Sequence, residues 1–539
     1  MQNMKQLTNK KNILQLVALM NGYGIRDVVV CPGSRNAPIV HTLAETGLFR
    51  CHAITDERSA GFVAIGIADA TNNSVAVCCT SGSAVLNIAP AVAEAYYRNV
   101  PLLVVSADRP KEIIGQMDGQ TMVQTECFGY LAKTYNISET DTDIYRNRLI
   151  NEALASLNLD HGKPIHINVQ IDEPLFNFDC PDLPKERIIE WELIKHNELS
   201  TSALKEWQNA RKKMFVIGQM PDNEAREISA EIERLTTYSD VVVVAEHLAN
   251  LHNANIIKHF DDILANADKA ATDKLAPNLV VYIGGHIVSK RLKQFLRSHP
   301  HKCWHITDSE SVIDLFHSTV RMVKAKPDLF LSKLKNKSTQ SDFAHIWHKY
   351  ADTLPKTNCT DYIQQSIVGQ IINRMPDNSV LALANSSSVR YAQHFDLPKD
   401  TITICNRGIN GIEGSLSAAV GFAMATNKLT IVITGDLSFF YDSNALWNNA
   451  LPNNLRIVLI NDGCGSIFSS LNGLEQSAHR DKLIAGAHTT SAENLCKAFG
   501  CKYLQATNKE EADKVLEHFY EPSERPIIIE FAFDAIRRQ

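Results

Sequence analysis

One stretch of the chain, residues 66–106, occurs a second time at residues 421–461. Gly66-Ile-Ala-Asp-Ala-Thr-Asn72 matches Gly421-Phe-Ala-Met-Ala-Thr-Asn427, and Val100–Ser106 matches Leu455–Asn461 at the same separation of 355 residues. Between them, Thr80-Ser-Gly-Ser83 meets Thr434-Gly-Asp-Leu437 after a one-residue slip. The duplicated unit has the pattern of a helix end, a strand, a turn, a helix and a strand. A single long-range duplication predicts two related domains, because solenoid repeats recur every ~20–50 residues.

Composition limits the class of protein. At ~100–200 residues per domain, 539 residues correspond to about three domains. The formal net charge of −6 is small for this length and argues against nucleic acid as the main partner, because phosphate binding requires a basic face. No apolar run reaches the ~18–20 residues of a membrane span, and the first residues lack the apolar core of a signal peptide.

The cysteine pattern indicates a reducing compartment. Twelve cysteines occur without a Cys-x-x-Cys pair, so the ligand spacing of a zinc site is absent. Single cysteines in apolar segments are typical of small buried residues in reduced proteins. We therefore expect a cytoplasmic protein.

Short apolar strands alternate with helical segments along the chain. They are predicted at Val28–Cys31, Ser74–Thr80, Pro101–Ser106, Pro164–Ile171, Lys213–Gly218, Val241–Ala245 and Leu279–Gly285. Nearly continuous apolar strands that alternate with helices predict parallel, doubly wound sheets and an α/β fold. Two segments, 177–186 and 333–342, are rich in proline or polar residues and are interpreted as linkers. The domains predicted on this basis are 1–180, 187–333 and 343–539.

Acidic residues follow two predicted strands of the second copy. Asp436 comes directly after Gly435, and Asp462 lies 26 residues later in Asn461-Asp-Gly463. Open α/β sheets bind ligands at the carboxyl ends of their strands, and two carboxylates at neighbouring strand ends suit Mg²⁺. A phosphate-bearing ligand is expected beside such an ion, because Gly435 permits a close backbone approach and a helix N-terminus favours an anion. The alternative role of a single strand-end aspartate is to cap a helix, but the pair favours a metal site.

The acidic pair resembles the diphosphate-binding motif of thiamine diphosphate enzymes, in which a Gly-Asp is followed after a similar interval by Asn-Asn. The resemblance implies three doubly wound domains of the pyrimidine-binding, middle and diphosphate-binding types. It implies Mg²⁺, with Mn²⁺ as the alternative, held by Asp436, Asp462 and the main-chain carbonyl of Cys464. The further cofactor contacts that it implies are Gly435, Leu437, Ser438 and Ile467. The chain departs from the family at Asp462, where asparagine is usual, and we expect the extra charge to strengthen cation binding and to weaken diphosphate binding.

The same family uses one glutamate of its pyrimidine-binding domain. Asp56 and Glu57 both stand at the start of a helical run, and chemistry alone does not choose between them; the family pattern selects Glu57. The alternative role of such an acid is to interact favourably with a helix N-terminus. Glu57 corresponds to Ile412 in the second copy. The resemblance implies that Glu57 is catalytic and hydrogen-bonds the aminopyrimidine, and that Ile412 is the apolar residue that bends the cofactor.

Further motifs indicate which family of thiamine diphosphate enzymes the chain resembles. They are Cys31-Pro-Gly-Ser-Arg-Asn-Ala-Pro38, Asp56-Glu-Arg58, Thr80-Ser-Gly82, Ala107-Asp-Arg-Pro110, Asn406-Arg-Gly408 and Gly435-Asp-Leu-Ser438. Together they resemble the 2-succinyl-5-enolpyruvyl-6-hydroxy-3-cyclohexene-1-carboxylate synthase family of menaquinone biosynthesis. The implied enzyme is a transferase that decarboxylates 2-oxoglutarate and adds the succinyl carbanion to isochorismate in a 1,4-addition. Arginines in these motifs suit dicarboxylic substrates, because a guanidinium binds a carboxylate through two parallel hydrogen bonds.

The narrower resemblance also implies substrate contacts and an assembly. The residues expected to contact substrates are Ser34, Arg35, Arg109, Gln120, Lys290, Ser386, Arg390, Arg407, Ile467 and Phe468. In this family Glu57 of one chain meets Asp436 of another, so we expect a homodimer or a homotetramer whose active sites lie between chains.

Two other functions fit parts of the sequence. One is a different thiamine diphosphate-dependent 2-oxo acid decarboxylase or an acetolactate-type carboligase. Enzymes of the acetolactate type often hold a flavin in the middle domain, but Val216-Ile-Gly218 lacks a full Gly-x-Gly-x-x-Gly fingerprint. The other is a non-catalytic scaffold, since a fold by itself does not specify chemistry. The joint presence of Glu57, Asp436 and Asp462 favours an enzyme.

Overall fold

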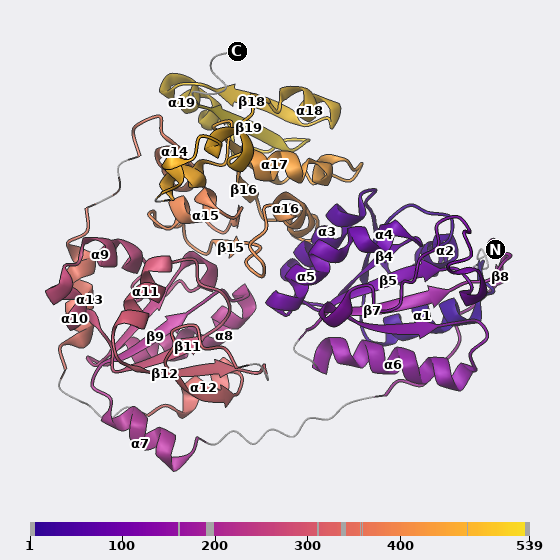
Figure 1. Cartoon of the computed structure of the whole chain (residues 1–539), viewed down its shortest axis with the longest axis horizontal. Helices are drawn as coiled ribbons and strands as arrows, with labels where there is room; N and C mark the ends of the chain where they lie inside the picture. The colour runs from indigo at the N-terminus through magenta and orange to yellow at the C-terminus, as the bar shows by residue number, and fades with distance from the viewer. Residues whose placement is uncertain are drawn as a thin grey trace. The chain divides into compact units, whose positions relative to one another are not determined.

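The chain forms two compact units, which are described separately (Figure 1). The computed structural model describes residues 6–159, 162–189, 199–309, 312–335, 341–355, 357, 359–471 and 473–533. The first unit combines Met1–Glu192 with Asn406–Gln539, and the second is Leu193–Cys405. Both copies of the sequence repeat therefore belong to the first unit, although 355 residues separate them along the chain.

A six-stranded parallel sheet forms the amino-terminal part of the first unit. Its strands lie in the order β3 (Arg50–Ala53), β2 (Asp27–Val30), β4 (Val75–Cys79), β5 (Leu102–Asp108), β7 (Ile165–Gln170) and β6 (Lys133–Ile137). One core joins the sheet to α1 (Lys11–Gly22), α2 (Ala37–Thr46) and α6 (Asp143–Leu159). Figure 1 shows α3 (Glu57–Thr71), α4 (Ser83–Asn87) and α5 (Ala89–Arg98) on the other side. The central strands β2, β4 and β5 are buried along their whole length, which explains their continuous apolar sequence.

The second copy of the repeat builds the same elements in the carboxyl-terminal part of the unit. Strands β16 (Thr430–Gly435), β17 (Leu455–Asn461), β19 (Ile527–Ala532) and β18 (Lys502–Ala506) pair in that order and run parallel. The helices here are α16 (Ser415–Met424), α17 (Asp436–Tyr441), α18 (Glu493–Ala498) and α19 (Lys509–Glu517). The order α3, β4, α4, β5 thus recurs as α16, β16, α17, β17, which confirms the predicted duplication.

The second unit contains a five-stranded parallel sheet. Its order is β10 (Val241–Ala245), β9 (Lys213–Ile217), β11 (Leu279–Ile283), β12 (Lys302–Thr307) and β13 (Thr319–Lys324). One core lies against α7 (Thr201–Asn209), α8 (Asp222–Thr236) and α12 (Pro327–Lys333). The core on the other face lies against α9 (Phe260–Asn266), α10 (Lys269–Leu275), α11 (Lys290–Ser298) and α13 (Phe343–Asp352). The unit also contains α14 (Gln364–Arg374), α15 (Ser387–Ala392) and the parallel pair β14 (Val380–Leu383) and β15 (Ile402–Ile404). The α/β class with doubly wound parallel sheets is therefore as predicted.

The segment 177–186 differs from its interpretation as a linker. It contains the strand β8 (Phe178–Cys180), which pairs antiparallel with β1 (Leu7–Thr8). A three-residue strand whose partner lies at the other end of a domain leaves no periodic pattern in the sequence. The second predicted linker, 333–342, begins where α12 ends, and its residues 336–340 lie outside the described part.

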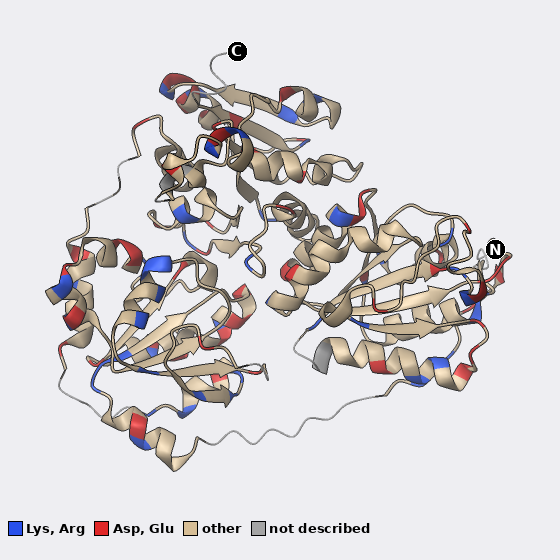
Figure 2. Cartoon of the chain, viewed as in Figure 1, with Lys and Arg blue, Asp and Glu red and all other residues tan. Residues whose placement is uncertain are grey.

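The sequence predicted neither a strongly basic face nor a membrane-spanning segment. Figure 2 shows acidic and basic residues interspersed over both units. Among the described residues, no helix combines the length and the apolar character needed to cross a membrane.

Helices α3 and α16, one from each copy of the repeat, meet backbone to backbone. A Cβ atom at Gly66 would lie 1.9 Å from the carbonyl oxygen of Ala418, and one at Gly421 would lie 2.1 Å from that of Val63. Gly66 corresponds to Gly421, and Val63 to Ala418, at the repeat separation of 355. The two contacts are therefore copies of each other, as at a two-fold interface. Only glycine permits this approach.

We expect Gly66→Ala or Gly421→Ala to destabilise the first unit by about 3 kcal/mol or more, because a methyl group cannot occupy a site less than 2.2 Å from a backbone oxygen. Gly119→Ala is the matched control, since a Cβ there meets nothing within 4 Å. Thermal unfolding of the three variants measures the effect. Melting of Gly66→Ala at the control's temperature would contradict the described contact.

Candidate active site

Asp436 and Asp462 lie at adjacent strand ends, as their spacing predicted. Strand β16 ends at Gly435, which is paired with Ile460 near the end of β17. Asp436 is 2% exposed; its Oδ1 accepts a hydrogen bond from the N–H of Leu437 at 2.6 Å. Its Oδ2 accepts from Gly463 at 2.8 Å and Cys464 at 3.1 Å. The turn after β17 is thereby fixed against the start of α17.

The side chains of the two aspartates contact each other. Burial raises the pKa of the Asp462 carboxyl to about 6, and the neighbouring Asp436 carboxylate adds to the rise. Two adjacent buried carboxylates repel each other, and a divalent cation between them would remove that repulsion. The arrangement is consistent with a cation site and disfavours the alternative of a simple helix cap.

The residues at this position fit a hard metal ion and a phosphate group. Each carboxylate oxygen carries two lone pairs; Oδ2 of Asp436 uses both on backbone N–H groups, whereas Oδ1 accepts one such bond and keeps a lone pair for a cation. Next to them, a Cβ at Gly435 would meet no atom within 4 Å, so the backbone there is open to a ligand. Cys464, whose carbonyl is the third predicted metal ligand, belongs to the same turn and donates its N–H to Asp436.

The loop that follows Cys464 folds back on itself. The N–H of Gly465 donates to Ala485 at 2.7 Å, and a Cβ at Gly465 would lie 2.8 Å from the ring of Phe468. Ile467 and Phe468, both predicted to line the site, are half-buried in this turn, two and three residues beyond Gly465.

His488 also belongs to this group, although no sequence motif pointed to it. Its Nε2 lies 3.4 Å from Oδ2 of Asp436, and its backbone N–H donates to Gly463 at 2.8 Å. The Asp436 carboxylate raises the pKa of the imidazole. The ring packs edge-on against Phe440. The histidine lies 26 residues beyond Asp462, in a segment without a recognisable motif.

Glu57 and Asp56, which residue chemistry did not distinguish, have different environments. Asp56 is the N-cap of α3 and accepts from Ser59 at 3.0 Å; its other oxygen accepts from Asn444 at 2.7 Å. Glu57 is half-buried in the first turn of α3, and its Oε2 accepts a long hydrogen bond from Asn87 Nδ2 at 3.5 Å. The Asp56 carboxylate is thus engaged in capping α3 and in binding Asn444. The Glu57 carboxylate has fewer and longer hydrogen bonds and can more readily bind a ligand.

The segment 406–412 leads into α16 and carries two predicted site residues. Arg407 is buried, whereas Ile412 is 39% exposed. The carbonyl of Ile412 accepts a hydrogen bond from Ser438 Oγ at 2.5 Å, which ties this segment to α17 beside Asp436. Ser438 was predicted as a cofactor contact; here it positions Ile412. Leu437, its predicted neighbour, is half-buried in the same turn of α17.

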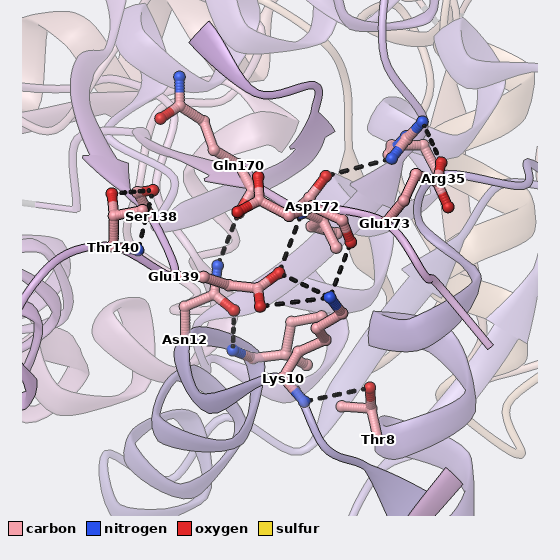
Figure 3. A network of polar contacts seen from close by, with 12 residues as sticks. Thr8, Lys10, Asn12, Arg35, Ser138, Glu139, Thr140, Gln170, Asp172 and Glu173 are labelled. Atoms are coloured by element: carbon pink, nitrogen blue, oxygen red, sulfur yellow. Dashed lines mark hydrogen bonds and ion pairs between the residues drawn. The ribbon is translucent and has the colours of Figure 1, made fainter. Parts of the chain in front are cut away.

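Arg35 lies in a polar network at the carboxyl end of the first sheet (Figure 3). Its guanidinium donates to the carbonyl of Ile171 at 3.1 Å and pairs with Glu173 at 2.9 Å. Arg35 is 5% exposed, and its Nε has no hydrogen-bond partner, whereas Glu173 is 65% exposed. Lys10 lies close by and bridges Glu139 to the carbonyl of Asp172. The Arg35 guanidinium is therefore held by the carboxylate of Glu173, which is itself exposed to solvent.

A second buried network holds the neighbouring loops. Gln124 accepts from the N–H of Gly82 at 2.8 Å and donates to Asn168 at 2.7 Å. Asn168 donates in turn to Asp108 at 2.8 Å, directly before Arg109. The carbonyl of Gln120 accepts from Ser81 Oγ at 3.0 Å. This network positions two predicted substrate residues, Arg109 and Gln120; a third, Ser34, is exposed next to Arg35.

The other three predicted residues belong to the second unit. Lys290 is exposed at the first position of α11. Ser386 has a left-handed backbone (φ 72°), and its carbonyl accepts from Arg390 at 2.5 Å. At the start of α11, the backbone N–H groups of Val288 and Ser289 donate to the carboxylate of Glu246 at 2.7 Å. A buried carboxylate of the protein itself thus binds the backbone directly before this helix.

Replacing Asp462 with Asn removes one of two adjoining negative charges. We expect the metal-free variant to be stabilised by roughly 1–2 kcal/mol, or about 2–8 °C in melting temperature, and to gain less than the wild type from Mg²⁺. Melting curves in chelator and in saturating Mg²⁺ measure both effects, with Glu510→Gln on α19 as an exposed control. An unchanged response to Mg²⁺ would remove Asp462 from the set of metal ligands.

Three family descriptions match the chain in succession. They are "Thiamine pyrophosphate enzyme, N-terminal TPP binding domain" at residues 14–130, "Middle domain of thiamine pyrophosphate" at 186–383 and "Thiamine pyrophosphate enzyme, C-terminal TPP binding domain" at 385–531. The thiamine diphosphate enzyme fold and cofactor predicted from the sequence are thus confirmed.

Relatives that match along almost the whole chain identify the family within the thiamine diphosphate enzymes. A 2-succinyl-5-enolpyruvyl-6-hydroxy-3-cyclohexene-1-carboxylate synthase of Bacteroides thetaiotaomicron is 44% identical over 536 residues, covering 97% of this chain and 96% of its own. Proteins of the same name from Phocaeicola vulgatus and Flavobacterium johnsoniae are 43% and 36% identical, and cover 98% and 97% of this chain and 96% and 97% of their own. The chain therefore belongs to the 2-succinyl-5-enolpyruvyl-6-hydroxy-3-cyclohexene-1-carboxylate synthase family.

Proposed function

We propose that this protein decarboxylates 2-oxoglutarate and transfers the succinyl unit to isochorismate, as a thiamine diphosphate-dependent step of menaquinone biosynthesis. The observation that carries the proposal is the similarity to synthases of that name along 97% of the chain. Bound thiamine diphosphate supplies the electron sink for the decarboxylation; the residues of the chain bind, orient and protonate.

Roles are proposed for the residues of the first unit. Asp436, Asp462 and the Cys464 carbonyl hold Mg²⁺, or Mn²⁺ in its place, and Gly435 leaves room for the diphosphate. This assignment is supported by the contact of the two carboxylates and by the open space at Gly435. Glu57 acts on the aminopyrimidine; the assignment is supported by the use of Asp56 as a helix cap.

Substrate binding is proposed for a set of cationic and polar side chains and for two apolar ones, Ile467 and Phe468. The set consists of Ser34, Arg35, Arg109, Gln120, Lys290, Ser386, Arg390, Arg407, Ile467 and Phe468. Arginine binds carboxylates through a planar pair of donors, and both proposed substrates are dicarboxylic acids. The Arg35 fork already pairs with a solvent-exposed carboxylate, that of Glu173, which supports the proposal that it binds carboxylates.

The second unit argues against an acetolactate-type enzyme with a flavin. A dinucleotide places its phosphates at a helix N-terminus. The two N–H groups directly before α11, those of Val288 and Ser289, already donate to the buried Glu246 carboxylate at 2.7 Å, so a phosphate at these groups would have to displace it. The retention of the acidic residues of the cofactor site likewise argues against a non-catalytic scaffold.

The proposal includes the domain ranges 1–180, 187–333 and 343–539 and a cytoplasmic location. All twelve cysteines are free thiols, which fits a reducing compartment.

A homodimer or homotetramer with composite sites is part of the proposal. Several large apolar side chains of the first unit are exposed, among them Tyr97, Met117, Tyr130, Ile412 and Trp447. Exposed apolar and aromatic residues of this kind are typical of protein interfaces. Sedimentation velocity of the full chain with cofactor and Mg²⁺ is expected to give a dimer or a tetramer; a stable, active monomer would contradict the composite site.

The activity is tested by CO₂ release from 2-oxoglutarate with thiamine diphosphate and Mg²⁺. We expect rapid release that depends on isochorismate and is accompanied by its consumption. Equal release with and without isochorismate would indicate a plain decarboxylase. Release from pyruvate but not from 2-oxoglutarate would favour the acetolactate-type alternative.

Glu57→Gln tests the catalytic assignment. We expect turnover to fall by roughly 10²–10⁴-fold, because general acid–base catalysis is lost, while cofactor affinity changes little. Asp56→Asn is the matched control: asparagine also caps helices, so turnover is expected to persist. Calorimetric titration of the cofactor and the CO₂ assay measure the two quantities. A Glu57→Gln enzyme with the wild-type rate would refute the assignment.

A further inference from the structure

A buried glutamate of the first copy holds the segment that leads to the second copy's helix. Glu94, in the middle of α5, is 1% exposed. Its Oε1 accepts from the N–H of Gly408 at 2.8 Å and its Oε2 from the N–H of Ile409 at 2.9 Å. We propose that Glu94 is a positioning residue that fixes segment 406–412, and with it Arg407 and Ile412, at the active site. This inference rests on the function proposed above.

The two hydrogen bonds require a carboxylate. Each oxygen of Glu94 serves a different backbone N–H, and a glutamine would present a donor to one of them. The buried charge is compensated by Arg98, whose Nε lies 3.9 Å from Glu94 Oε1. Arg98 is held in turn by both oxygens of Asp69, at 2.9 and 3.0 Å. The ion pair with Arg98 and the two backbone hydrogen bonds offset the cost of removing the Glu94 carboxylate from water.

The backbone of the segment lies directly on α5. A Cβ at Gly408 would be 2.8 Å from both the carbonyl oxygen and Oε2 of Glu94. Two other contacts fix the end of the segment: Ser438 donates to the Ile412 carbonyl, and Gly414 packs on the ring of Phe62, 2.3 Å from where its Cβ would be. Glu94 is the restraint adjacent to Arg407.

Glu94 can affect the reaction rate without contacting a substrate, because it holds a segment that carries two proposed site residues. Arg407 is buried and directly precedes Gly408, so the hydrogen bonds that hold the Gly408 and Ile409 amides also help to place the Arg407 backbone from which its side chain extends. A displacement of about 1 Å at a reacting site can cost roughly 10²-fold in rate. The acid on α5 therefore couples the pyrimidine-binding half of the unit to the placement of Arg407 and Ile412.

The test compares Glu94→Gln with Asp69→Asn in the full-length protein. Both variants weaken the same buried cluster, but only Glu94→Gln removes an acceptor from the segment. We expect hydrogen exchange of the peptide that covers residues 406–412 to rise on the order of tenfold in Glu94→Gln and to stay near the wild-type rate in Asp69→Asn. We expect kcat/KM for 2-oxoglutarate to fall roughly 10–100-fold in Glu94→Gln only.

The outcomes separate the inference from the proposed function. Wild-type exchange in Glu94→Gln would overturn the inference, as would faster exchange with an unchanged kcat/KM. Equal losses of kcat/KM in Glu94→Gln and Asp69→Asn would also overturn it, because they would reflect stability alone. Failure of the wild-type protein to turn over 2-oxoglutarate would refute the proposed function, whereas the exchange measurement would still decide whether Glu94 holds the segment.

Discussion

The crossing of α3 and α16 is the contact on which the site depends. Each helix presents a glycine, Gly66 or Gly421, to a backbone carbonyl of the other, so the helices approach more closely than side chains would allow. Because these contacts are copies related by the repeat, the two domains meet through corresponding surfaces. Glu57 begins one helix and Ile412 precedes the other, so the same contact that joins the copies also sets the positions from which their diverged residues act.

Helix N-termini and strand ends are used in opposite ways in the two units. Directly before α11 the chain supplies its own anion, since the Glu246 carboxylate accepts the N–H groups of Val288 and Ser289. At β16 and β17 it supplies two carboxylates instead, and burial raises the pKa of Asp462. Two acids at that edge repel each other, and a bound cation would relieve the repulsion, as a metal–diphosphate site requires. The Asp56 and Glu94 carboxylates are used differently again, to fix backbone near the site.

Much of the fold was predictable because buried parallel strands are apolar along their whole length. The seven predicted strands are present, and the repeat identified the two related domains. Within 177–186, which was interpreted as a linker, the short strand β8 was missed because it pairs with the distant β1. Glu94, His488 and Glu173 were missed for a related reason: the backbone groups bound by Glu94 lie 314 and 315 residues away, and no local pattern marks such a partner. A lone acid in the apolar run Ala89–Ala95 was the one available signal for Glu94.

By itself, the sequence determined the α/β class, the duplicated domains, the acidic pair at 436 and 462 and the resemblance to the synthase family. These follow from the apolar character of the strands, from a duplication at a fixed separation and from short motifs at strand ends. The tertiary structure decided that Asp56, and not Glu57, caps α3. It also decided that Glu246 binds the backbone before α11 and that Glu94 holds the segment before α16. Those choices depend on hydrogen bonds between residues far apart in the chain, and only the packed fold brings donor and acceptor within 3 Å of each other.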